Sequence, residues 1–430
     1  MILTLYRFLT LLLAPLIRLW LHYRLRKGKE DGERLHERFG LSRINRPAGQ
    51  LIWVHAASVG ESNSVLPLIE LLAARAPDIH LLITTGTVTS ARHVEKRLPE
   101  RTMHQFVPVD TPNAVRLFLN HWQPNAAIWV ESEFWPNLMQ ETCIRRIPMT
   151  LINARMSDRS YLRWQRYRAT FLQLMSCFSH AYAGSMEDLE KFHQLGLDSM
   201  RYVGNLKYDA PPLAADPKEL ERLRQAVAHR TVWLAASTHA GEEALIADIH
   251  QTLRKTYSNL LTIIVPRHAH RGAAVAQELH GLRLHICCRS KQELPDANTD
   301  IYLADTMGEL GIFYRLCQVV VIGGSLLPIG GHNPIEPAQL GCAILCGPHM
   351  DNFVGICEEL SDAGGLVQTR DVPTLRMLID YWLANPKYPE EHAEKALQAT
   401  AKHTGVATTL ATDILASIPH VAPDTSRGAA

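Results

Sequence analysis

A chain of 430 residues is too long for one ordinary hydrophobic core, so we expect two domains of about 200 residues each. The hydrophobic and charged fractions, 47% and 20%, are those of a globular protein, and a formal net charge of +1 argues against a polyanionic partner such as nucleic acid. The eight cysteines lie mostly in apolar runs, which predicts free buried thiols in a reducing compartment.

The N-terminal segment, residues 1–22, is almost wholly apolar and has no small-residue cleavage site typical of a removable signal peptide. Its charge-free part, residues 8–17, is only about half the length needed to cross a bilayer. A short span, an interfacial helix and an ordinary buried helix all remain open. A basic cluster follows, which favours a cytoplasmic body beside anionic lipid, and it comprises Arg24, Arg26, Lys27 and Lys29.

Strands and helices then alternate up to residue 205. The predicted strands are residues 51–57, 80–85, 104–109, 126–130 and 149–152, and the helical patterns are 62–75, 113–122 and 134–145. Repeated βα units predict a parallel sheet covered on both faces. Residues 209–213 (DAPPL) are typical of a linker.

A second series of strands follows the linker, at residues 231–237, 259–265, 282–288, 318–323 and 342–346. The sequence therefore predicts an α/β protein with two doubly wound domains that face a central cleft. We assign residues 1–49 to a membrane-associated helix and basic segment, 50–208 to the first domain and 209–430 to the second. This architecture hosts nucleotide-sugar transferases and some epimerases, and the fold alone does not choose among them.

The most informative stretch is 319–337, VVVIGGSLLPIGGHNPIEP. It reads as a buried strand, a glycine-rich turn and a helix start with Asn333 at the N-cap and Pro334 at the first helical position. Such a turn presents bare backbone N–H groups and a helix dipole to a phosphate. Glu336 would then accept hydrogen bonds from ribose hydroxyls. The alternative is a glycine turn that binds nothing.

Carboxylates follow two strands of the first half. Glu61 is predicted at a helix N-terminus, which favours the ionised form that a general base needs. The alternative is that Glu61 serves only the helix dipole. His55 is a competitor, but inside the strand it is expected to pack or to orient the turn. Glu131 and Glu133 come directly after a buried strand, where carboxylates are costly to place without a purpose.

Other candidates are individually weaker. Lys207, near the linker, could meet a charged substrate group or be merely exposed. Arg267 offers a forked donor for phosphate or carboxylate at the end of a strand. Asp305 is predicted to cap a helix start, and the backbone of 307–309 could contact a base edge.

Residues 153–168 interleave five arginines with three aromatic residues. They could bind the phosphates of an amphiphile at a membrane surface, with nucleic acid binding or a solvated face as the alternatives. The sequence has no DxD-like pair, HExxH or four-cysteine array, so we predict no metal site.

Nine motifs, in order from about residue 50 to 353, resemble those of the 3-deoxy-D-manno-octulosonic acid (Kdo) transferases of Gram-negative bacteria. They are HAASVGE, ESEFWPNL, NARMSDRS, GNLKYD, STHAGEE, VPRHAHR, DTMGEL, GGHNPIEPA and GPHMDNF. One departure is His270 in VPRHAHR, where an acidic residue is expected.

The resemblance implies a GT-B fold, N-terminal association with the inner membrane on its cytoplasmic side, and no cofactor. It implies transfer of Kdo from CMP-Kdo to the lipid A precursor (lipid IVA) in lipopolysaccharide core biosynthesis. Glu61 would be the base, assisted by Glu131 and Lys207. The residues expected to hold CMP are Pro266, Arg267, His268, Met307, Gly308, Glu309, Gly331, Asn333, Pro334, Ile335 and Glu336.

Arg155 and Arg159 are the expected acceptor contacts. A base and a leaving group on opposite faces of the sugar predict inversion at the anomeric carbon, with the departing phosphate held by Arg267 and the glycine turn rather than by metal. Two alternative functions are a nucleotide-sugar epimerase on the same fold and a non-catalytic nucleotide sensor or scaffold.

Overall fold

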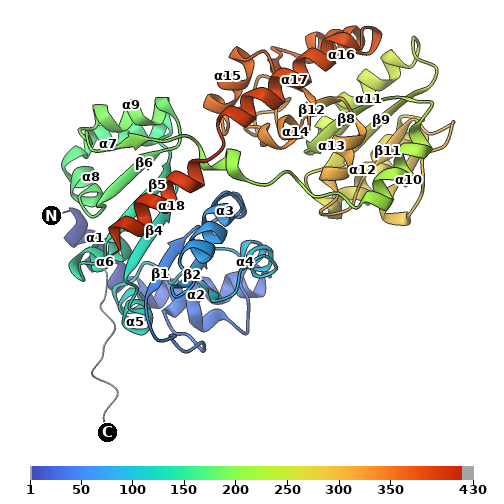
Figure 1. Ribbon diagram of the computed structural model, residues 1–430. Coiled ribbons are helices and arrows are strands. Elements are labelled where there is room, and N and C mark those ends of the chain that lie inside the picture. The colour runs from blue at the N-terminus through green and yellow to red at the C-terminus, as the bar shows by residue number, and fades with distance from the viewer. Residues whose placement is uncertain (1, 419–430) are drawn as a thin grey trace. The chain divides into compact units, whose positions relative to one another are not determined.

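The computed structural model describes residues 2–418, which form two compact units, each with its own parallel sheet (Figure 1). Among the described residues, the first unit contains 2–210 and 403–418, and the second contains 211–402. The chain therefore leaves the first unit within the predicted linker and later returns to it.

The first unit has a seven-stranded sheet in the order β3-β2-β1-β4-β5-β6-β7. The strands are β1 (Leu51–His55), β2 (His80–Thr85), β3 (Thr102–Phe106), β4 (Ala126–Val130), β5 (Met149–Ala154), β6 (His180–Ala183) and β7 (Arg201–Tyr202). The helices between them are α3 (Val59–Arg75), α4 (Val88–Glu95), α5 (Pro112–Trp122), α6 (Pro136–Ile144), α7 (Asp158–Arg166), α8 (Arg168–Met175) and α9 (Met186–Gln194). The predicted βα alternation is confirmed, although β6 and β7 were not predicted because they are very short.

Both faces of this sheet are covered, which explains its continuous apolar strands. All of β1 is buried, and its residues alternate between the two faces. Trp53 packs with side chains of α5, α6, α8 and α9 on one face. Val54 packs with side chains of α3, α4 and α18 (Val406–Ser417) on the other.

The second unit has a seven-stranded parallel sheet in the order β10-β11-β9-β8-β12-β13-β14. Its strands are β8 (Thr231–Thr238), β9 (Leu260–Pro266), β10 (Ile286–Cys288), β11 (Ile301–Leu303), β12 (Val319–Ile322), β13 (Ala343–Cys346) and β14 (Leu366–Gln368). Its helices are α10 (Pro217–Val227), α11 (Glu242–Leu253), α12 (Gly272–Gly281), α13 (Leu310–Leu316), α14 (Ile335–Gln339), α15 (Val354–Asp362), α16 (Val372–Ala384) and α17 (Lys387–Lys402). Two doubly wound α/β units confirm the predicted fold class.

One domain assignment needs correction. We expected residues 209–430 to belong wholly to the second domain, but α18 is part of the first unit. Its Val406, Leu410 and Ile414 are buried in the hydrophobic cluster that α3 also lines. Burial of this apolar row against α3 is the physical reason why the chain returns (Figure 1).

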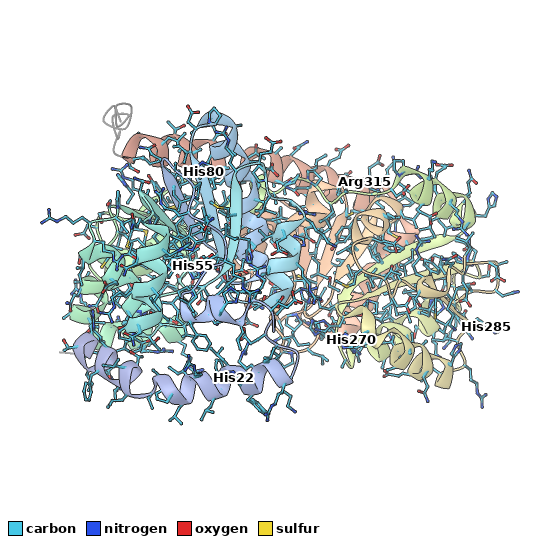
Figure 2. The ribbon with its side chains drawn as sticks, turned by 90° about the horizontal axis from the view of Figure 1, so that it is seen from below. His22, His55, His80, His270, His285 and Arg315 are labelled. Carbon is cyan, nitrogen blue, oxygen red and sulfur yellow. The ribbon has the colours of Figure 1, made fainter. Side chains whose placement is uncertain are left out.

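The N-terminal segment forms two helices, α1 (Ile2–Leu12) and α2 (Ala14–Arg26), that lie along the first unit (Figure 2). One row of their side chains faces the protein. Within it, Leu3 and Leu21 are buried, and the Tyr6 hydroxyl donates to Asp110 Oδ2 at 2.9 Å. Asn137 Nδ2 donates to Thr10 Oγ1 at 2.9 Å.

The exposed apolar row of these two helices and their junction consists of Ile2, Leu5, Phe8, Leu9, Leu11, Leu12, Leu13, Leu16, Leu19, Trp20 and Tyr23. Within residues 2–418, no individual helix has the length and apolar character needed to cross a membrane. Taken together, α1 and α2 meet those two criteria, with a bend of 61° between them.

Candidate functional site

Each sheet has one position where its strand order reverses, and the candidate residues gather at these two positions. In the first sheet β1 lies between β2 and β4, and in the second sheet β8 lies between β9 and β12. In doubly wound sheets, ligands bind outside the carboxyl ends of the strands at this switch point. The segments after β1 and β4 carry Glu61 and Glu131, and those after β8 and β12 carry His239 and the glycine turn.

Glu61 lies in the first turn of α3, as predicted. Ser58 caps the helix by accepting a hydrogen bond from Glu61 N, and Glu61 Oε1 accepts one from the Ser58 hydroxyl at 2.7 Å. Glu61 Oε2 accepts from Ala57 N at 2.7 Å. These contacts resemble a capping box, except that Glu61 accepts from Ala57 N rather than from the N-cap N–H of Ser58, so part of the role of Glu61 is structural.

Glu61 is more buried than a helix cap needs to be, and its pKa is raised. Glu61 is only 5% exposed, whereas glutamates that cap helices usually face solvent. Burial, and then the charge of Glu131, raise the pKa of Glu61 to about 7, despite the hydrogen bonds from Ser58 and Ala57. A carboxyl group that titrates near neutral pH is suited to act as a general base.

Glu131 and Lys207 form an ion pair beside Glu61. Lys207 Nζ lies 3.0 Å from Glu131 Oε1, and both side chains are largely shielded from solvent. Glu131 has a φ of 57°, a left-handed conformation that costs a residue with a Cβ about 1–3 kcal/mol. Glu131 and Lys207 are thus paired in the first unit, close enough to Glu61 for the Glu131 charge to act on it.

A further carboxylate, Glu133, extends this group. Trp135 Nε1 donates to Glu133 Oε2 at 3.1 Å, while burial raises the pKa of Glu133. His55 is fully buried, and its Nδ1 lies 3.0 Å from Thr84 Oγ1. Burial lowers the pKa of His55 to about 3, so this histidine is neutral and packs inside the sheet, as expected.

The two predicted acceptor residues lie in the segment that follows β5. Arg155 directly follows β5, and its backbone N–H donates to Ser132 Oγ at 2.9 Å. Arg159 is exposed in the first turn of α7. Trp164 of the same helix packs near Phe134, with ring centroids 6.5 Å apart. The arginine-rich segment therefore borders the carboxyl edge of β4 and β5.

In the second unit the glycine turn differs from the expectation of bare N–H groups. The carboxylate of Glu242, which is fully buried at the start of α11, accepts hydrogen bonds from His239 N at 2.9 Å, Gly324 N at 2.7 Å and Leu326 N at 2.9 Å. Two amides of the turn are thus already occupied by a protein carboxylate. Gly331 has a φ of 74°, a left-handed conformation that favours glycine, and a Cβ there would lie 2.3 Å from Met350 Sδ.

The helix after the turn also starts later than predicted. Pro334 is the residue that precedes α14, and Asn333 Oδ1 accepts from Ile335 N at 3.1 Å. Asn333 Nδ2 donates to Glu336 Oε1 at 3.4 Å. The helix has only five residues, so its dipole contributes less than expected. Burial raises the pKa of Glu336, and nearby Arg267 opposes that rise.

The other residues predicted to contact CMP differ in exposure and in the partners of their side chains. Arg267 and His268 are exposed after Pro266 at the end of β9, and Met307 is 71% exposed. Gly308 has a φ of 85° and open space around it. Glu309 is different, because its carboxylate is bound by Arg289 Nη2 at 2.6 Å. The Glu309 side chain is thus engaged within the protein, and the expected contact of the 307–309 backbone with a base edge stays a prediction.

The expected capping role of Asp305 is wrong. The Asp305 carboxylate accepts from Ser290 N at 2.8 Å and from the Ser290 hydroxyl at 2.7 Å, so it anchors the segment after β10. The residue that precedes α13 is Glu309, which makes no side-chain cap.

A histidine pair was not predicted. His239 Nε2 lies 2.8 Å from His332 Nε2, and the two rings stack with an interplanar angle of 9°. Burial, followed by the charge of Arg267, lowers the pKa of His332 to about 4. His270, the residue that departs from the motif, stacks on His268 with ring centroids 5.6 Å apart. The one signal for this cluster in the sequence is that His239 and His268 each follow the end of a predicted strand.

Within residues 2–418, no group of three or more His, Cys, Asp or Glu side chains is arranged to hold a metal ion. The eight cysteines form no disulfide, and five of them are buried.

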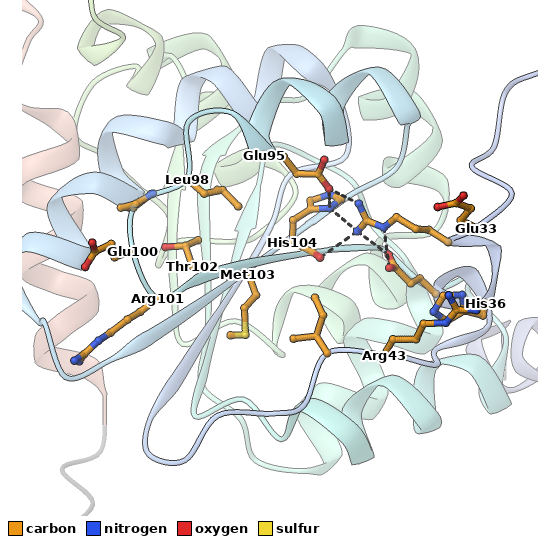
Figure 3. Close-up of a pocket in the computed structure, with 14 residues that line it drawn as sticks. Glu33, His36, Arg43, Glu95, Leu98, Glu100, Arg101, Thr102, Met103 and His104 are labelled. Atoms are coloured by element: carbon orange, nitrogen blue, oxygen red, sulfur yellow. Dashed lines mark hydrogen bonds and ion pairs between the residues drawn. The ribbon is translucent and has the colours of Figure 1, made fainter.

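A pocket of about 670 Å³ lies elsewhere in the first unit, beside the edge strand β3 (Figure 3). Arg34 there pairs with Glu37 at 2.8 Å and also contacts Glu95. Glu37 Oε2 accepts from Phe106 N at 2.7 Å. These side chains satisfy polar groups of an edge strand, and the pocket includes the start of β3 rather than the carboxyl edge that carries Glu61.

The architecture is that of the GT-B class of glycosyltransferases and related epimerases. A solved UDP-GlcNAc 2-epimerase from Neisseria meningitidis bound to UDP-GlcNAc is similar with a TM-score of 0.59 at 14% identity, covering 86% of this chain and 100% of that one. A solved glycosyltransferase from Rickettsia africae gives a TM-score of 0.60 at 11% identity, with coverages of 86% and 99%. At these identities the likeness shows the fold alone.

Sequence comparison is more specific. A family model described as 3-deoxy-D-manno-octulosonic-acid transferase (kdotransferase) matches residues 33–210. The chain is 36% identical to a probable mitochondrial 3-deoxy-D-manno-octulosonic acid transferase of Arabidopsis thaliana, over 90% of this chain and 89% of that protein. It is 33% identical to the 3-deoxy-D-manno-octulosonic acid transferase of Rickettsia bellii, with coverages of 88% and 90%. The chain belongs to the Kdo transferase family of glycosyltransferases, as its motifs predicted.

The three hydrogen bonds to Glu242 generate a test of the glycine turn. Glu242→Gln should lower the free energy of unfolding by about 1.5–3 kcal/mol, because an amide leaves at least one of three buried N–H groups poorly paired. Glu278→Gln, an exposed carboxylate on α12, is the matched control and should have little effect. Urea unfolding of both variants is the measurement. Equal midpoints would show that Glu242 does not brace the turn.

Proposed function

We propose that this protein transfers Kdo from CMP-Kdo to the lipid A precursor, lipid IVA, with inversion at the anomeric carbon, in lipopolysaccharide core biosynthesis. Membership of the Kdo transferase family supports the donor sugar and the reaction class. The observation that carries the mechanism is the buried carboxylate of Glu61, with a pKa of about 7, next to the ion pair of Glu131 and Lys207.

In the proposed reaction Glu61 takes the proton from a hydroxyl of the acceptor. The hydroxyl oxygen forms a bond to the anomeric carbon of Kdo, and the bond from that carbon to the phosphate oxygen of CMP breaks. CMP leaves with the bonding electron pair and the proton stays on Glu61. The hydroxyl is a poor nucleophile until it is deprotonated, so a positioned base is the group that the reaction most needs. Attack opposite the leaving group inverts the anomeric centre.

Lys207 and Glu131 have complementary parts in this proposal. The ammonium group of Lys207 can stabilise negative charge near the reacting carbon, including the carboxylate that Kdo carries. Glu131 holds the ammonium group at 3.0 Å, and its own charge helps to keep the pKa of Glu61 high. A base with a pKa near the working pH combines adequate basicity with a substantial ionised fraction.

CMP is the proposed ligand of the second unit. The exposed guanidinium of Arg267 is suited to the phosphate, and the exposed backbone around Gly308 leaves room for a base edge. Asn333 and Glu336, which hydrogen-bond to each other, offer polar groups to a ribose. CMP is a good leaving group that an arginine can neutralise, so the proposed reaction requires neither a metal ion nor a cofactor.

Arg155 and Arg159 are the proposed contacts for phosphate groups of the acceptor. Support comes from their position beside the carboxyl edge that carries Glu131 and from the exposure of Arg159. A guanidinium group can bind phosphate through two parallel hydrogen bonds.

We also propose that the protein works at the cytoplasmic face of the inner membrane, with α1 and α2 lying on the lipid surface. The exposed apolar row of both helices supports this, because such a row is costly to leave in water. Polar contacts of the opposite row, such as Tyr6 with Asp110, hold the helices to the protein body. An interfacial position uses both rows, whereas a span would have to break the inner contacts.

The test of the base uses Glu61→Gln. The amide oxygen of glutamine can keep the hydrogen bond from Ala57 N, and its NH2 group can donate to Ser58 Oγ, so the fold and CMP affinity should stay near wild type while transfer falls about 10²–10⁴-fold. In the wild type, kcat/KM should increase with pH through about 7, because the raised pKa leaves Glu61 protonated and inactive below that value. The measurement is release of CMP from CMP-Kdo in the presence of acceptor. Turnover within a few-fold of wild type would place the base elsewhere.

The membrane proposal is tested with Phe8→Glu and Leu16→Glu combined. Both side chains are more than half exposed, so the fold should persist while partition onto vesicles of phosphatidylethanolamine and phosphatidylglycerol falls at least about tenfold, since each large apolar side chain contributes roughly 1.5–3 kcal/mol. Met377→Glu, an equally exposed apolar residue on α16, is the control. Vesicle flotation is the measurement, and unchanged flotation of the double variant would contradict the interfacial position.

A further inference from the structure

Lys207 is carried by a short turn that the far end of the chain holds in place. It lies in η2 (Leu206–Asp209), a single 3₁₀ turn at the end of the first pass through the first unit. Such a short element has little stability of its own. Its neighbours are α3 and α18, and α18 begins almost two hundred residues later in the sequence.

The main link between η2 and α18 is the carboxylate of Asp209. Asp209 Oδ1 accepts from Gly405 N at 2.6 Å, and Asp209 Oδ2 accepts from Ala407 N. These are backbone N–H groups at the start of α18, where a helix lacks internal partners and where a carboxylate is favoured by the dipole. Asp209 therefore fixes its own turn and the first turn of α18 to each other.

Packing reinforces this link on both sides of Lys207. Leu206 is fully buried in the cluster that contains Val406. The ring of Tyr208 stacks on His403 with centroids 5.0 Å apart. Gly204 lies so close to Val406 that a Cβ would be 2.6 Å from its Cγ2. The residues before and after Lys207 are thus held by the segment that leads into α18.

The same turn is held from the sheet and is aligned with the helix that bears Glu61. Asn153 Oδ1, at the end of β5, accepts from Leu206 N at 3.2 Å. α18 also lies along α3, and Arg75 Nη1 of α3 donates to Thr412 Oγ1 at 2.9 Å. A shift of α18 would therefore affect Lys207 directly and the helix of Glu61 as well.

We propose that Asp209, together with α18, is a positioning device that holds the Lys207 ammonium group against Glu131. Asp209 touches no reacting atom and acts only through the turn that carries Lys207. The alternative is that Asp209 merely caps α18 and contributes to stability without any effect on Lys207. The kinetic consequence of the proposal rests on the proposed transferase function, but the placement of Lys207 does not.

Asp209→Asn is the principal variant. It removes the charge and turns one of the two acceptors into a donor that faces a backbone N–H group, so the turn should loosen. Asp209→Ser, which keeps one acceptor suited to a helix start, is a second and milder variant. The matched control is Tyr182→Phe, which removes the 2.6 Å hydrogen bond to Asp413 in α18 but leaves the turn of Lys207 intact. Melting temperatures are recorded for all three variants.

The first readout does not depend on activity. The side chain of Lys207 is only 14% exposed in the ion pair, so its modification by acetic anhydride, followed by peptide mass spectrometry, should be slow in the wild type and in Tyr182→Phe. It should be faster in Asp209→Asn and, to a smaller extent, in Asp209→Ser. Labelling of Lys207 at the wild-type rate in folded Asp209→Asn would overturn the proposal.

The second readout is kinetic. Asp209→Asn should lower kcat by about 10- to 100-fold, as expected when a reacting group is displaced by about 1 Å, with little change in CMP affinity. The lower limb of the pH profile should move to higher pH, because a Glu131 charge without its ammonium partner raises the pKa of Glu61 further. A lower kcat with an unmoved profile and unchanged labelling would show a role in stability alone. If the wild type transfers no Kdo, the proposed function fails while the labelling result still decides the placement of Lys207.

Discussion

The ion pair between Lys207 and Glu131 is the interaction on which the first unit's site depends. Glu61, Glu131 and Glu133 lie close enough for their charges to influence one another in a largely buried setting. Carboxylates that converge in this way repel each other unless a cation is near. Lys207 supplies that charge at 3.0 Å. Burial first, and then the charge of Glu131, leave Glu61 with a pKa of about 7, which is the property that a base at neutral pH needs.

That ion pair depends in turn on the return of the chain to the first unit as α18. Lys207 sits at the end of the first pass through the N-terminal unit, and the chain must complete the second unit before α18 can pack against that turn. The site of the first unit is therefore incomplete until nearly the whole chain has been made. In the second unit, Glu242 has a comparable role, because one buried carboxylate joins the end of β8 to the glycine turn after β12.

Much of the fold could be predicted from local sequence. Apolar runs indicated the long strands, and carboxylates directly after such runs indicated Glu61 and Glu131. The pairing of Glu131 with Lys207 could not be predicted from the residues alone, because their separation in sequence carries no information on distance. For the same reason α18 was assigned to the wrong domain. The ion pair between Glu309 and Arg289 was not predicted, because Arg289 lies in a segment whose position no periodicity reveals.

The glycine turn illustrates a second limit. Its residues correctly indicated a strand, a turn and a helix, yet the sequence does not say which backbone N–H groups remain available. A buried carboxylate that uses Gly324 N and Leu326 N changes the anion-binding argument, which now rests more on Arg267 than on the turn itself. Membership of the Kdo transferase family indicates the reaction class, which the contacts of the glycine turn do not.

The most direct test of the central account is the structure of the product. The wild-type protein is incubated with CMP-Kdo and lipid IVA, and the purified glycolipid is analysed by mass spectrometry and by NMR of its anomeric carbon. The account predicts Kdo attached to the lipid with the anomeric configuration opposite to that of the donor, together with one equivalent of CMP for each Kdo transferred. A retained configuration, or CMP release that yields only free Kdo, would contradict base-assisted transfer through Glu61.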